Sequence, residues 1–381
     1  MSQAIEERRA LARLATEEVA GLPGGIGSVH AAVADRVFSA LGPAALPVRM
    51  MHDGIALGSY LTVRAWLTFA GFAAGSALER RGERPPSTTP GGAAVIAAVN
   101  ALRGDVLERE GSPLALPMSA RRDGEPVGPE AFAGVERLAV FVHGLGETEF
   151  AWGREPYGAR LPGWEPLYLR YNTGRHISEN GASLDELLEA VDAREIALVG
   201  HSMGGLVARS AAHRAAQRGA AWTKRVRVMV SLGSPHFGAP LEQAVHVASA
   251  GLNALPETRP FARYLRRRSA GIRDLRRGSL VDEDWRDHDH DPDALRARAC
   301  AEVPLLEGAT HCFVAATVTR SPNHPVGRLL GDMLVLAPSA SGRSRARRLF
   351  EDENGLELGG THHLALLNHP AVYEQLRRWL D

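Results

Sequence analysis

The 381-residue sequence has only two cysteines, one lysine and no net charge. Its two cysteines, Cys300 and Cys312, are too few for a disulfide framework, and we expect two reduced thiols, with one disulfide between them as the alternative. Lys224 is the one lysine, and 44 basic residues balance 44 acidic residues. A nucleic-acid-binding protein needs a surplus of positive charge or a basic face. The sequence therefore argues against nucleic acid as a partner.

Long apolar segments are also missing. The most apolar stretch, residues 65–77, has about 13 residues, whereas a membrane-spanning helix needs about 20. The first twenty residues are charged and lack the apolar core of a signal peptide. No phosphate-binding glycine loop or dinucleotide fingerprint is present. These absences favour a cytoplasmic protein of ordinary globular composition.

Residues 1–110 predict a helical N-terminal module without a catalytic constellation. Apolar residues recur at helical spacing in four segments, at 4–20, 28–41, 52–81 and 93–108. We expect this module to pack on the main domain. The alternative is a lipid-facing surface made by Trp66, Phe69 and Phe72, because amphipathic helices that contact membranes have a similar pattern.

Residues 111–381 predict an α/β domain with a mostly parallel central sheet, because short apolar runs alternate with helical patterns. A hairpin with a turn at 121–124 precedes the first of these runs. The runs are at 137–143, 166–172, 195–201, 225–233 and 311–318. A capping box of Ser183 and Glu186 predicts the start of one helix. The helical, arginine-rich stretch 238–300 is expected to be a cap or lid inserted above the sheet edge.

The motif Gly200-His201-Ser202-Met203-Gly204 has the pattern G-x-S-x-G between a predicted strand and a predicted helix. This arrangement is typical of a nucleophile elbow, in which a strained turn lifts the serine hydroxyl above the sheet. Glycine at the flanking positions lets the neighbouring backbone approach closely, and the helix N-terminus favours negative charge at the serine. We therefore expect Ser202 to be a catalytic nucleophile.

A serine nucleophile needs a general base and an acid that orients the base, in the chain order Ser, Asp or Glu, His. The base should lie on a loop before the C-terminal helix, which is predicted over residues 368–380. His363 in this loop is our candidate, and His362 is the alternative. We interpret His369 as a helix-start residue and His201 as a packing residue.

The orienting acid is expected after the strand at 311–318. Asp332 is our candidate, and the acidic run 351–353 is the alternative. The acid accepts the second N–H of the imidazole and stabilises the imidazolium ion as it forms. An oxyanion hole needs two backbone N–H groups. We expect these from Met203, directly after the nucleophile, and from Leu145, in the loop after the first inner strand.

At these motifs the chain resembles bacterial α/β-hydrolase lipases and esterases, close to the branch of GPI-inositol-deacylase-like proteins. The matching segments are VHGLGET (142–148), RYNTGRHISENG (170–181), GHSMGG (200–205), LGSPHFGAP (232–240), GDMLV (331–335) and THHLALLNHP (361–370). The resemblance implies an α/β-hydrolase fold, cleavage of carboxylic esters, often with long acyl chains, and no organic cofactor. The family pattern H-x-x-L-L matches His363, Leu366 and Leu367, which favours His363 over His362. The family's acid motif is usually G-D-G-L-V, whereas Met333 stands at the second glycine here.

Two polar segments are weaker candidates for sites. The run 282–293 alternates Asp and His as some metal sites do, but we interpret it as a solvated loop. The basic run 263–277 could contact phosphate groups or anionic lipid, although we favour a solvated lid helix.

The sequence therefore predicts a serine hydrolase that cleaves carboxylic esters of small molecules or lipids through an acyl-enzyme intermediate. The alternatives are an acyltransferase with the same triad and a binding protein on a hydrolase fold without catalysis. Peripheral contact with a membrane surface is compatible with either. No feature of the sequence predicts the oligomeric state.

Overall fold

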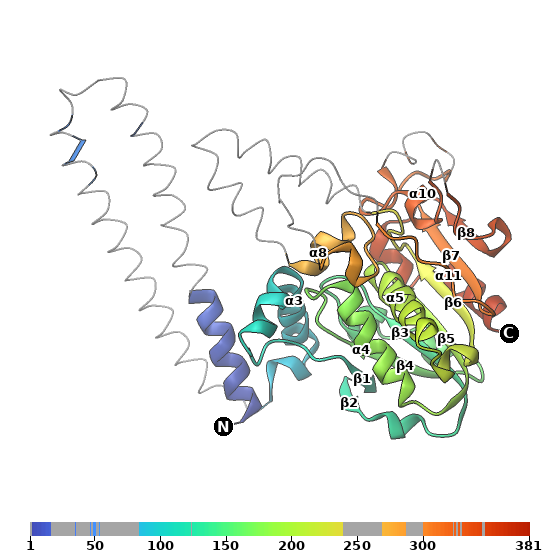
Figure 1. The fold of residues 1–381 in the computed structure, drawn as a ribbon, viewed down its shortest axis with the longest axis horizontal. Helices are drawn as coiled ribbons and strands as arrows, with labels where there is room; N and C mark the ends of the chain where they lie inside the picture. The colour runs from blue at the N-terminus through green and yellow to red at the C-terminus, as the bar shows by residue number, and fades with distance from the viewer. Residues whose placement is uncertain are drawn as a thin grey trace. The chain divides into compact units, whose positions relative to one another are not determined.

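The computed structural model describes residues 2–16, 84–122, 124–238, 269–286, 300–322, 330–344 and 347–381, with single positions at 35, 46, 49, 50, 53, 324 and 327. The chain divides into two compact units, drawn as a ribbon in Figure 1. The smaller consists of Met1–Thr89, Ser112–Leu114 and Ala244–Arg267, and the larger of Pro90–Gly111, Ala115–Gln243 and Arg268–Asp381.

In the smaller unit, residues 3–16 are helical, which agrees with the helix predicted over 4–20. The buried carboxylate of Glu7 accepts hydrogen bonds from the backbone N–H (2.8 Å) and the hydroxyl (2.6 Å) of Ser87. The predicted helices at 28–41 and 52–81 lie almost entirely outside the described residues, as do all three aromatic residues of the predicted lipid-facing surface. Within the described part of the chain, no helix has the length and apolar character needed to cross a bilayer.

The larger unit is built around an eight-stranded sheet with the strand order β2-β1-β4-β3-β5-β6-β7-β8 (Figure 1). Its strands are β1 Ser119–Arg122, β2 Glu125–Val127, β3 Val135–Val142, β4 Glu165–Arg170, β5 Ala193–His201, β6 Val226–Leu232, β7 Thr310–Ala316 and β8 Gly355–Leu358. Strand β1 pairs antiparallel with β2 and β4, and all other neighbours pair parallel. The five predicted apolar runs coincide with β3 to β7. This is the mostly parallel α/β architecture that the sequence predicts.

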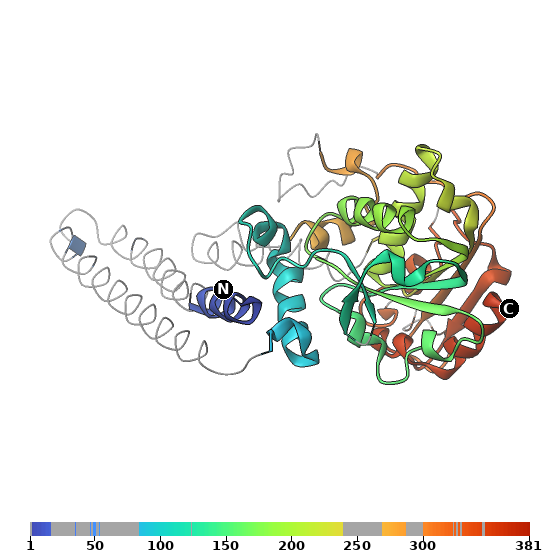
Figure 2. The ribbon, with the colours of Figure 1, turned by 90° about the horizontal axis from the view of Figure 1, so that it is seen from below.

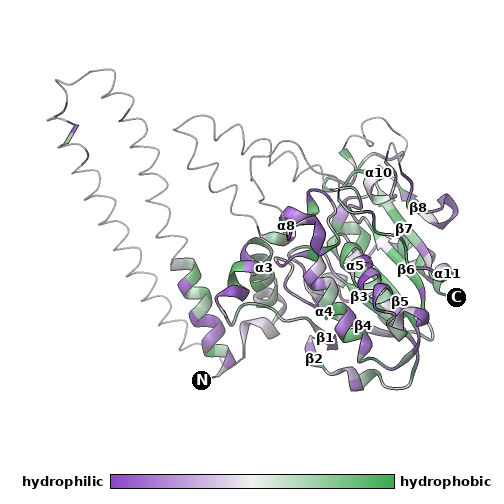
Figure 3. Ribbon diagram, viewed as in Figure 1, coloured by the Kyte–Doolittle hydropathy of each residue, from purple (hydrophilic) through white to green (hydrophobic). Residues whose placement is uncertain are grey.

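Helices cover both faces of this sheet. The described helices of the larger unit are α3 Pro90–Arg109, α4 Ile177–Glu189, α5 Met203–Gln217, α8 Ala270–Leu275, α10 Ala337–Ala340 and α11 Pro370–Leu380, with short 3-10 turns between elements. Helices α4 and α5 lie side by side (Figures 1 and 2) and share one core cluster with Leu138 and Val140 of β3. Helix α11 shares a second core cluster with Ala139 and Phe141 of β3. Alternate side chains of a strand face opposite sides, so the buried stretches of strands covered on both faces are mainly apolar (Figure 3).

Helix α11 follows the sequence prediction closely. Pro370 occupies its first turn, and Val372, Leu376 and Leu380 are its buried residues. The ring Nδ1 of His369 accepts the N–H of Ala371 (3.2 Å), so this histidine caps the helix as expected. The loop before α11 contains His363, and its residues Leu366 and Leu367 are buried in the core cluster that α11 joins.

The start of helix α4 differs from the prediction. The helix begins at Ile177, ahead of the predicted capping box, and the carboxylate of Glu179 accepts the N–H of His176 (3.1 Å) at its N-terminus. Ser183 lies inside the helix, where its hydroxyl donates to the carbonyl of Glu179 (3.2 Å). Gly181 does not break the helix because it packs against α5, where a Cβ atom would lie 2.4 Å from the hydroxyl of Ser210. The capping-box prediction was therefore wrong.

Helix α3 confirms the helix predicted over 93–108, but it belongs to the larger unit. The side-chain amide of Asn172 donates to the carbonyl of Gly104 (2.9 Å), and the hydroxyl of Ser269 donates to that of Ala101 (2.5 Å). Residues 90–110 thus group with the sheet rather than with the N-terminal residues. The predicted two-domain division and the cap at 238–300 stay predictions.

Candidate active site

Ser202 lies at the sharp turn between β5 and α5. Its φ of 53° and ψ of −121° fall in a region that non-glycine residues rarely adopt. The N–H of Ser202 donates to the carbonyl of Leu232 (2.8 Å), the last residue of the neighbouring strand β6. This bond holds the strained turn against the carboxyl end of the sheet. Such strain is concentrated at functional sites.

The glycines of the motif are required by the close approach of backbone. A Cβ atom at Gly200 would lie 2.3 Å from the amide nitrogen of Gly205, and one at Gly204 would lie 2.1 Å from the carbonyl oxygen of Val142. Both distances are shorter than non-bonded atoms allow. Glycine at these two positions therefore lets α5 begin directly above β3 and β5 and keeps the serine turn tight.

Asp332 and His363 form a buried hydrogen-bonded pair. The Nδ1 of His363 lies 2.6 Å from Oδ2 of Asp332, and the backbone N–H of His363 donates to the carbonyl of Asp332 (3.0 Å). The other carboxylate oxygen, Oδ1, accepts the N–H groups of Leu334 (3.0 Å) and Val335 (2.8 Å). Since Asp332 is fully buried, these bonds fix both oxygens of its carboxylate.

The carboxyl end of β6 brings these groups to one place. Leu232 accepts the bond from Ser202, and a Cβ atom on the next residue, Gly233, would lie 3.2 Å from Cε1 of His363 and 3.3 Å from Oδ2 of Asp332. The three predicted residues therefore surround the same strand end. In parallel α/β sheets this edge is where ligands bind.

Met333 occupies a position suited to glycine. Its φ is 87°, in the left-handed region, and its side chain is 70% exposed. The family acid motif has glycine here, and the positive φ explains that preference because a Cβ atom is strained in this conformation. This chain keeps the turn despite the strain.

The loop after β3 lies against the serine. A Cβ atom on Gly144 would lie 3.0 Å from Cβ of Ser202, which places Leu145 beside the nucleophile turn. The N–H of Gly146 donates to the hydroxyl of Thr173 (3.1 Å). Among the hydrogen bonds between described residues, none uses the N–H of Leu145 or Met203 as its donor. Neither predicted oxyanion donor therefore has an acceptor among the described residues.

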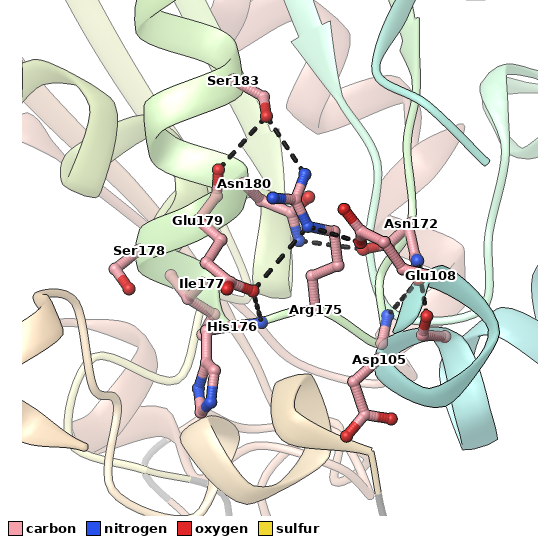
Figure 4. A network of polar contacts seen from close by, with 12 residues as sticks. Asp105, Glu108, Asn172, Arg175, His176, Ile177, Ser178, Glu179, Asn180 and Ser183 are labelled. Carbon is pink, nitrogen blue, oxygen red and sulfur yellow. Dashed lines mark hydrogen bonds and ion pairs between the residues drawn. The ribbon is translucent and has the colours of Figure 1, made fainter. Parts of the chain in front are cut away.

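A polar network next to Thr173 supports this loop (Figure 4). The side-chain amide of Asn180 on α4 donates to the carbonyl of Asn172 (2.9 Å), and the guanidinium of Arg175 lies 2.8 Å from the carboxylate of Glu108 on α3. Figure 4 shows these side chains gathered where the N-terminus of α4 meets α3. The network fixes the segment around Thr173, whose hydroxyl accepts the N–H of Gly146.

Glu147 and His201 were not predicted as site residues. The side chain of His201 is buried, and that of Glu147 is 12% exposed. Oε2 of Glu147 accepts the N–H of Gly144 (2.6 Å) and lies 3.0 Å from Nδ1 of His201. The Nε2 of His201 lies 3.3 Å from the carbonyl oxygen of His363. The interpretation of His201 as a packing residue thus missed its polar contacts. The pair is 54 positions apart in the chain, so no local pattern could reveal it.

The alternative site residues lie elsewhere. His362 is exposed, and His369 caps α11. Glu351, Asp352 and Glu353 are exposed, and Asp352 forms ion pairs with two arginines. None of them contacts His363 among the described hydrogen bonds and ion pairs. Asp332 is therefore the acid that meets the predicted base.

Metal ligands and a disulfide are not found among the described residues. No group of three or more His, Cys, Asp or Glu side chains in the described ranges could hold a metal ion, although the run 282–293 is described only to residue 286. Both cysteines are free, with Cys312 buried in β7.

Comparisons with known proteins connect the chain to a family. The family model of the PGAP1-like alpha/beta domain matches residues 185–287, which include the serine turn. No curated protein matches the chain by sequence. This family match confirms the resemblance that the sequence motifs indicate.

Several solved structures are similar in fold. The mature lipase BlEst2 of Bacillus licheniformis is 19% identical, with 69% of this chain and 98% of that chain covered and a TM-score of 0.42. Naproxen esterase (carboxylesterase NP) of Bacillus subtilis is 12% identical, with coverages of 74% and 98% and a TM-score of 0.38. The carboxylesterase CesB of Bacillus subtilis is 10% identical, with coverages of 65% and 84% and a TM-score of 0.36.

Proposed function

We propose that this chain, with its match to the PGAP1-like alpha/beta domain, is a serine hydrolase that cleaves carboxylic esters. One observation carries the proposal: the strained serine turn and a buried Asp–His pair meet at the end of the same strand. Ser202 is the nucleophile, His363 the general base and Asp332 the acid that orients it. A serine hydroxyl is a weak nucleophile, and such a base activates it.

The geometry supports an acyl-enzyme mechanism. Asp332 accepts the proton on Nδ1 of His363, which leaves Nε2 as an acceptor for the proton of Ser202 as the hydroxyl attacks the ester carbonyl. His363 then donates this proton to the leaving alcohol. Water attacks the acyl-enzyme through the same base, which releases the acid and restores the serine.

The N–H groups of Leu145 and Met203, which have no acceptor in the described part of the chain, are suited to the oxyanion. Preorganised donors at the developing charge are each worth about 2.7–4 kcal/mol in other hydrolases. The hydrogen bonds of Gly144 and Gly146 hold the backbone on either side of Leu145. The helix N-terminus at Met203 adds favourable electrostatics for the negative oxygen.

Apolar side chains beside the Asp–His pair favour an ester with an acyl chain. Leu330, Met333, Leu334 and Leu364 are all at least 38% exposed, and they flank Asp332 and His363 in the chain. Exposed apolar side chains gathered around a reactive site mark a surface for an apolar ligand. We therefore propose that the acyl part of the substrate contacts these four side chains, which we call the substrate-binding rim.

Hydrolysis of p-nitrophenyl esters of increasing acyl length tests the proposal. We expect the wild-type chain to hydrolyse them, Ser202→Ala to be inactive, and the matched serine variant Ser112→Ala, in the loop after α3 and outside the network of Figure 4, to retain the wild-type rate. A fluorophosphonate probe should label the wild type and not Ser202→Ala. A folded wild-type chain that neither hydrolyses esters nor reacts with the probe would refute the proposal and favour a binding protein.

A further inference from the structure

Glu147 and His201 connect three segments of the proposed site. The carboxylate of Glu147 accepts the N–H of Gly144 in the oxyanion loop. His201 immediately precedes the nucleophile and contacts Glu147 through one ring nitrogen and the carbonyl of His363 through the other. Neither side chain is needed for the chemical steps described above, yet His201 is buried and Glu147 is mostly buried beside the groups proposed to perform them.

The partners of His201 determine its charge. A carboxylate oxygen and a carbonyl oxygen can only accept hydrogen bonds. Nδ1 of His201 faces the first at 3.0 Å, and Nε2 faces the second at 3.3 Å. A neutral imidazole has one N–H and would turn a lone pair toward one of these oxygens. The ring satisfies both contacts only as an imidazolium ion.

The surroundings favour this charged pair. Burial alone would lower the pKa of His201, but the adjacent carboxylate of Glu147, with smaller contributions from the His363 carbonyl and Asp332, raises it. Burial alone would raise the pKa of Glu147, but His201, the N–H of Gly144 and His143 hold that pKa at about 2. The ring of His201 also packs edge-on against Trp152 and lies 4.8 Å, centroid to centroid, from that of His363.

We propose that Glu147 and His201 are positioning residues of the proposed hydrolase, a carboxylate–imidazolium pair that holds the oxyanion loop, the serine turn and the loop of His363 in their relative positions. The inference rests on the proposed function. The pair acts through Gly144, Ser202 and His363 and contacts no reacting atom.

Loss of the proton from His201 breaks the arrangement in a defined way. Below the pKa of His201, Nε2–H donates to the carbonyl of His363. Above it, a lone pair faces that carbonyl oxygen, and the repulsion releases the loop of the base. Because the proposed base is displaced while the substrate-binding rim is not, kcat falls at alkaline pH and KM changes little.

The test is the dependence of kcat and KM on pH, from pH 5 to 9.5, in the full chain. Glu147→Gln removes the negative charge at nearly constant shape, so the alkaline limb of kcat should move to lower pH by one unit or more. In His201→Gln the side chain does not titrate, so this limb should disappear. Both variants should lose kcat by about 10- to 100-fold near pH 8, with KM within about threefold of the wild type.

His311→Gln is the matched control. His311 is also a buried histidine whose Nε2 contacts a carbonyl, that of Leu306 at 3.0 Å, but it lies near the amino end of β7, away from the site. Its replacement should leave the alkaline limb in place. If the limb is unchanged in Glu147→Gln and His201→Gln, or moves equally in His311→Gln, the positioning role is wrong.

A second measurement does not depend on activity. The ring nitrogen chemical shifts of His201 in the wild-type chain should show two protonated nitrogens at pH 7, and one protonated nitrogen would overturn the proposal. A wild type that cleaves no ester contradicts the proposed function, while the nitrogen shifts still decide the charge of the pair. If the wild type is active but the decrease of kcat at alkaline pH is unchanged in Glu147→Gln and His201→Gln, only the positioning role is contradicted.

Discussion

Asp332→Asn is expected to keep the fold and to lower kcat by about 10³- to 10⁴-fold. The exchange replaces one oxygen by an NH2 group, so packing at this fully buried position is preserved. The orientation of the new side chain follows from the structure. Oδ1 of Asp332 accepts two backbone N–H groups, from Leu334 and Val335. An NH2 group cannot accept these bonds, so the asparagine carbonyl stays there and its NH2 group faces His363.

The reversed hydrogen bond explains the size of the effect. When a donor faces Nδ1 of His363, that nitrogen must be the acceptor, and the ring proton moves to Nε2. A ring protonated at Nε2 cannot take the proton of Ser202. The expected loss corresponds to an increase in the activation barrier of about 4–5.5 kcal/mol.

The assay is kcat for a p-nitrophenyl ester, with thermal unfolding to verify the fold. Asp352→Asn is the control, because Asp352 belongs to the alternative acidic run and its side chain is 52% exposed in an ion pair with Arg343. This control should retain the wild-type rate. A rate for Asp332→Asn above about a tenth of wild type would refute the tautomer argument. A large loss of rate in Asp352→Asn would instead indicate that the orienting acid lies in the run 351–353.

Three further predictions concern stability. Gly204→Ala places a Cβ atom 2.1 Å from the carbonyl of Val142 and should destabilise the chain by more than about 3 kcal/mol in urea unfolding. Gly91→Ala, a helix position with nothing within 4 Å of its Cβ, should stabilise the chain by about 0.5–1 kcal/mol, and equal effects would contradict the packing argument. Met333→Gly relieves the positive φ of 87° and should raise the unfolding free energy by about 1 kcal/mol; an unchanged Tm would show that Met333 is not strained. Glu147, with its pKa lowered from 4.5 to about 2, contributes stability that is complete above pH 4.5 and is lost as pH falls toward 2. The excess stability of the wild type over Glu147→Gln, on the order of 3 kcal/mol at pH 7, should therefore shrink at pH 3, and a pH-independent difference would exclude an ionised Glu147.

Local patterns were sufficient to predict the elements that carry the site. The apolar runs of β3 to β7 are recognisable because both faces of the sheet are covered. The turn at Ser202 is recognisable because its neighbours Gly200 and Gly204 have no room for a side chain. Helix α11 is recognisable from its apolar spacing and from Pro370.

Features that depend on tertiary packing could not be predicted from the sequence. The strand β8 is a short edge strand of four residues with no buried position, so it has no apolar run. Helix α4 continues through Gly181 because α5 lies against that glycine. The contact of His201 with His363 joins residues 162 positions apart. Each of these depends on a neighbour that only the folded chain brings close.

The assembly of the site from distant segments has a consequence for how the chain gains activity during folding. The serine turn follows β5, the acid follows β7, and the histidine precedes α11, so the site needs non-local pairings that form slowly. A chain with β3 to β6 paired but α11 undocked has the proposed nucleophile in place without the proposed base. Recovery of the proposed esterase activity after dilution from denaturant should therefore lag behind the recovery of secondary structure, and it would report on the last docking step rather than on the first.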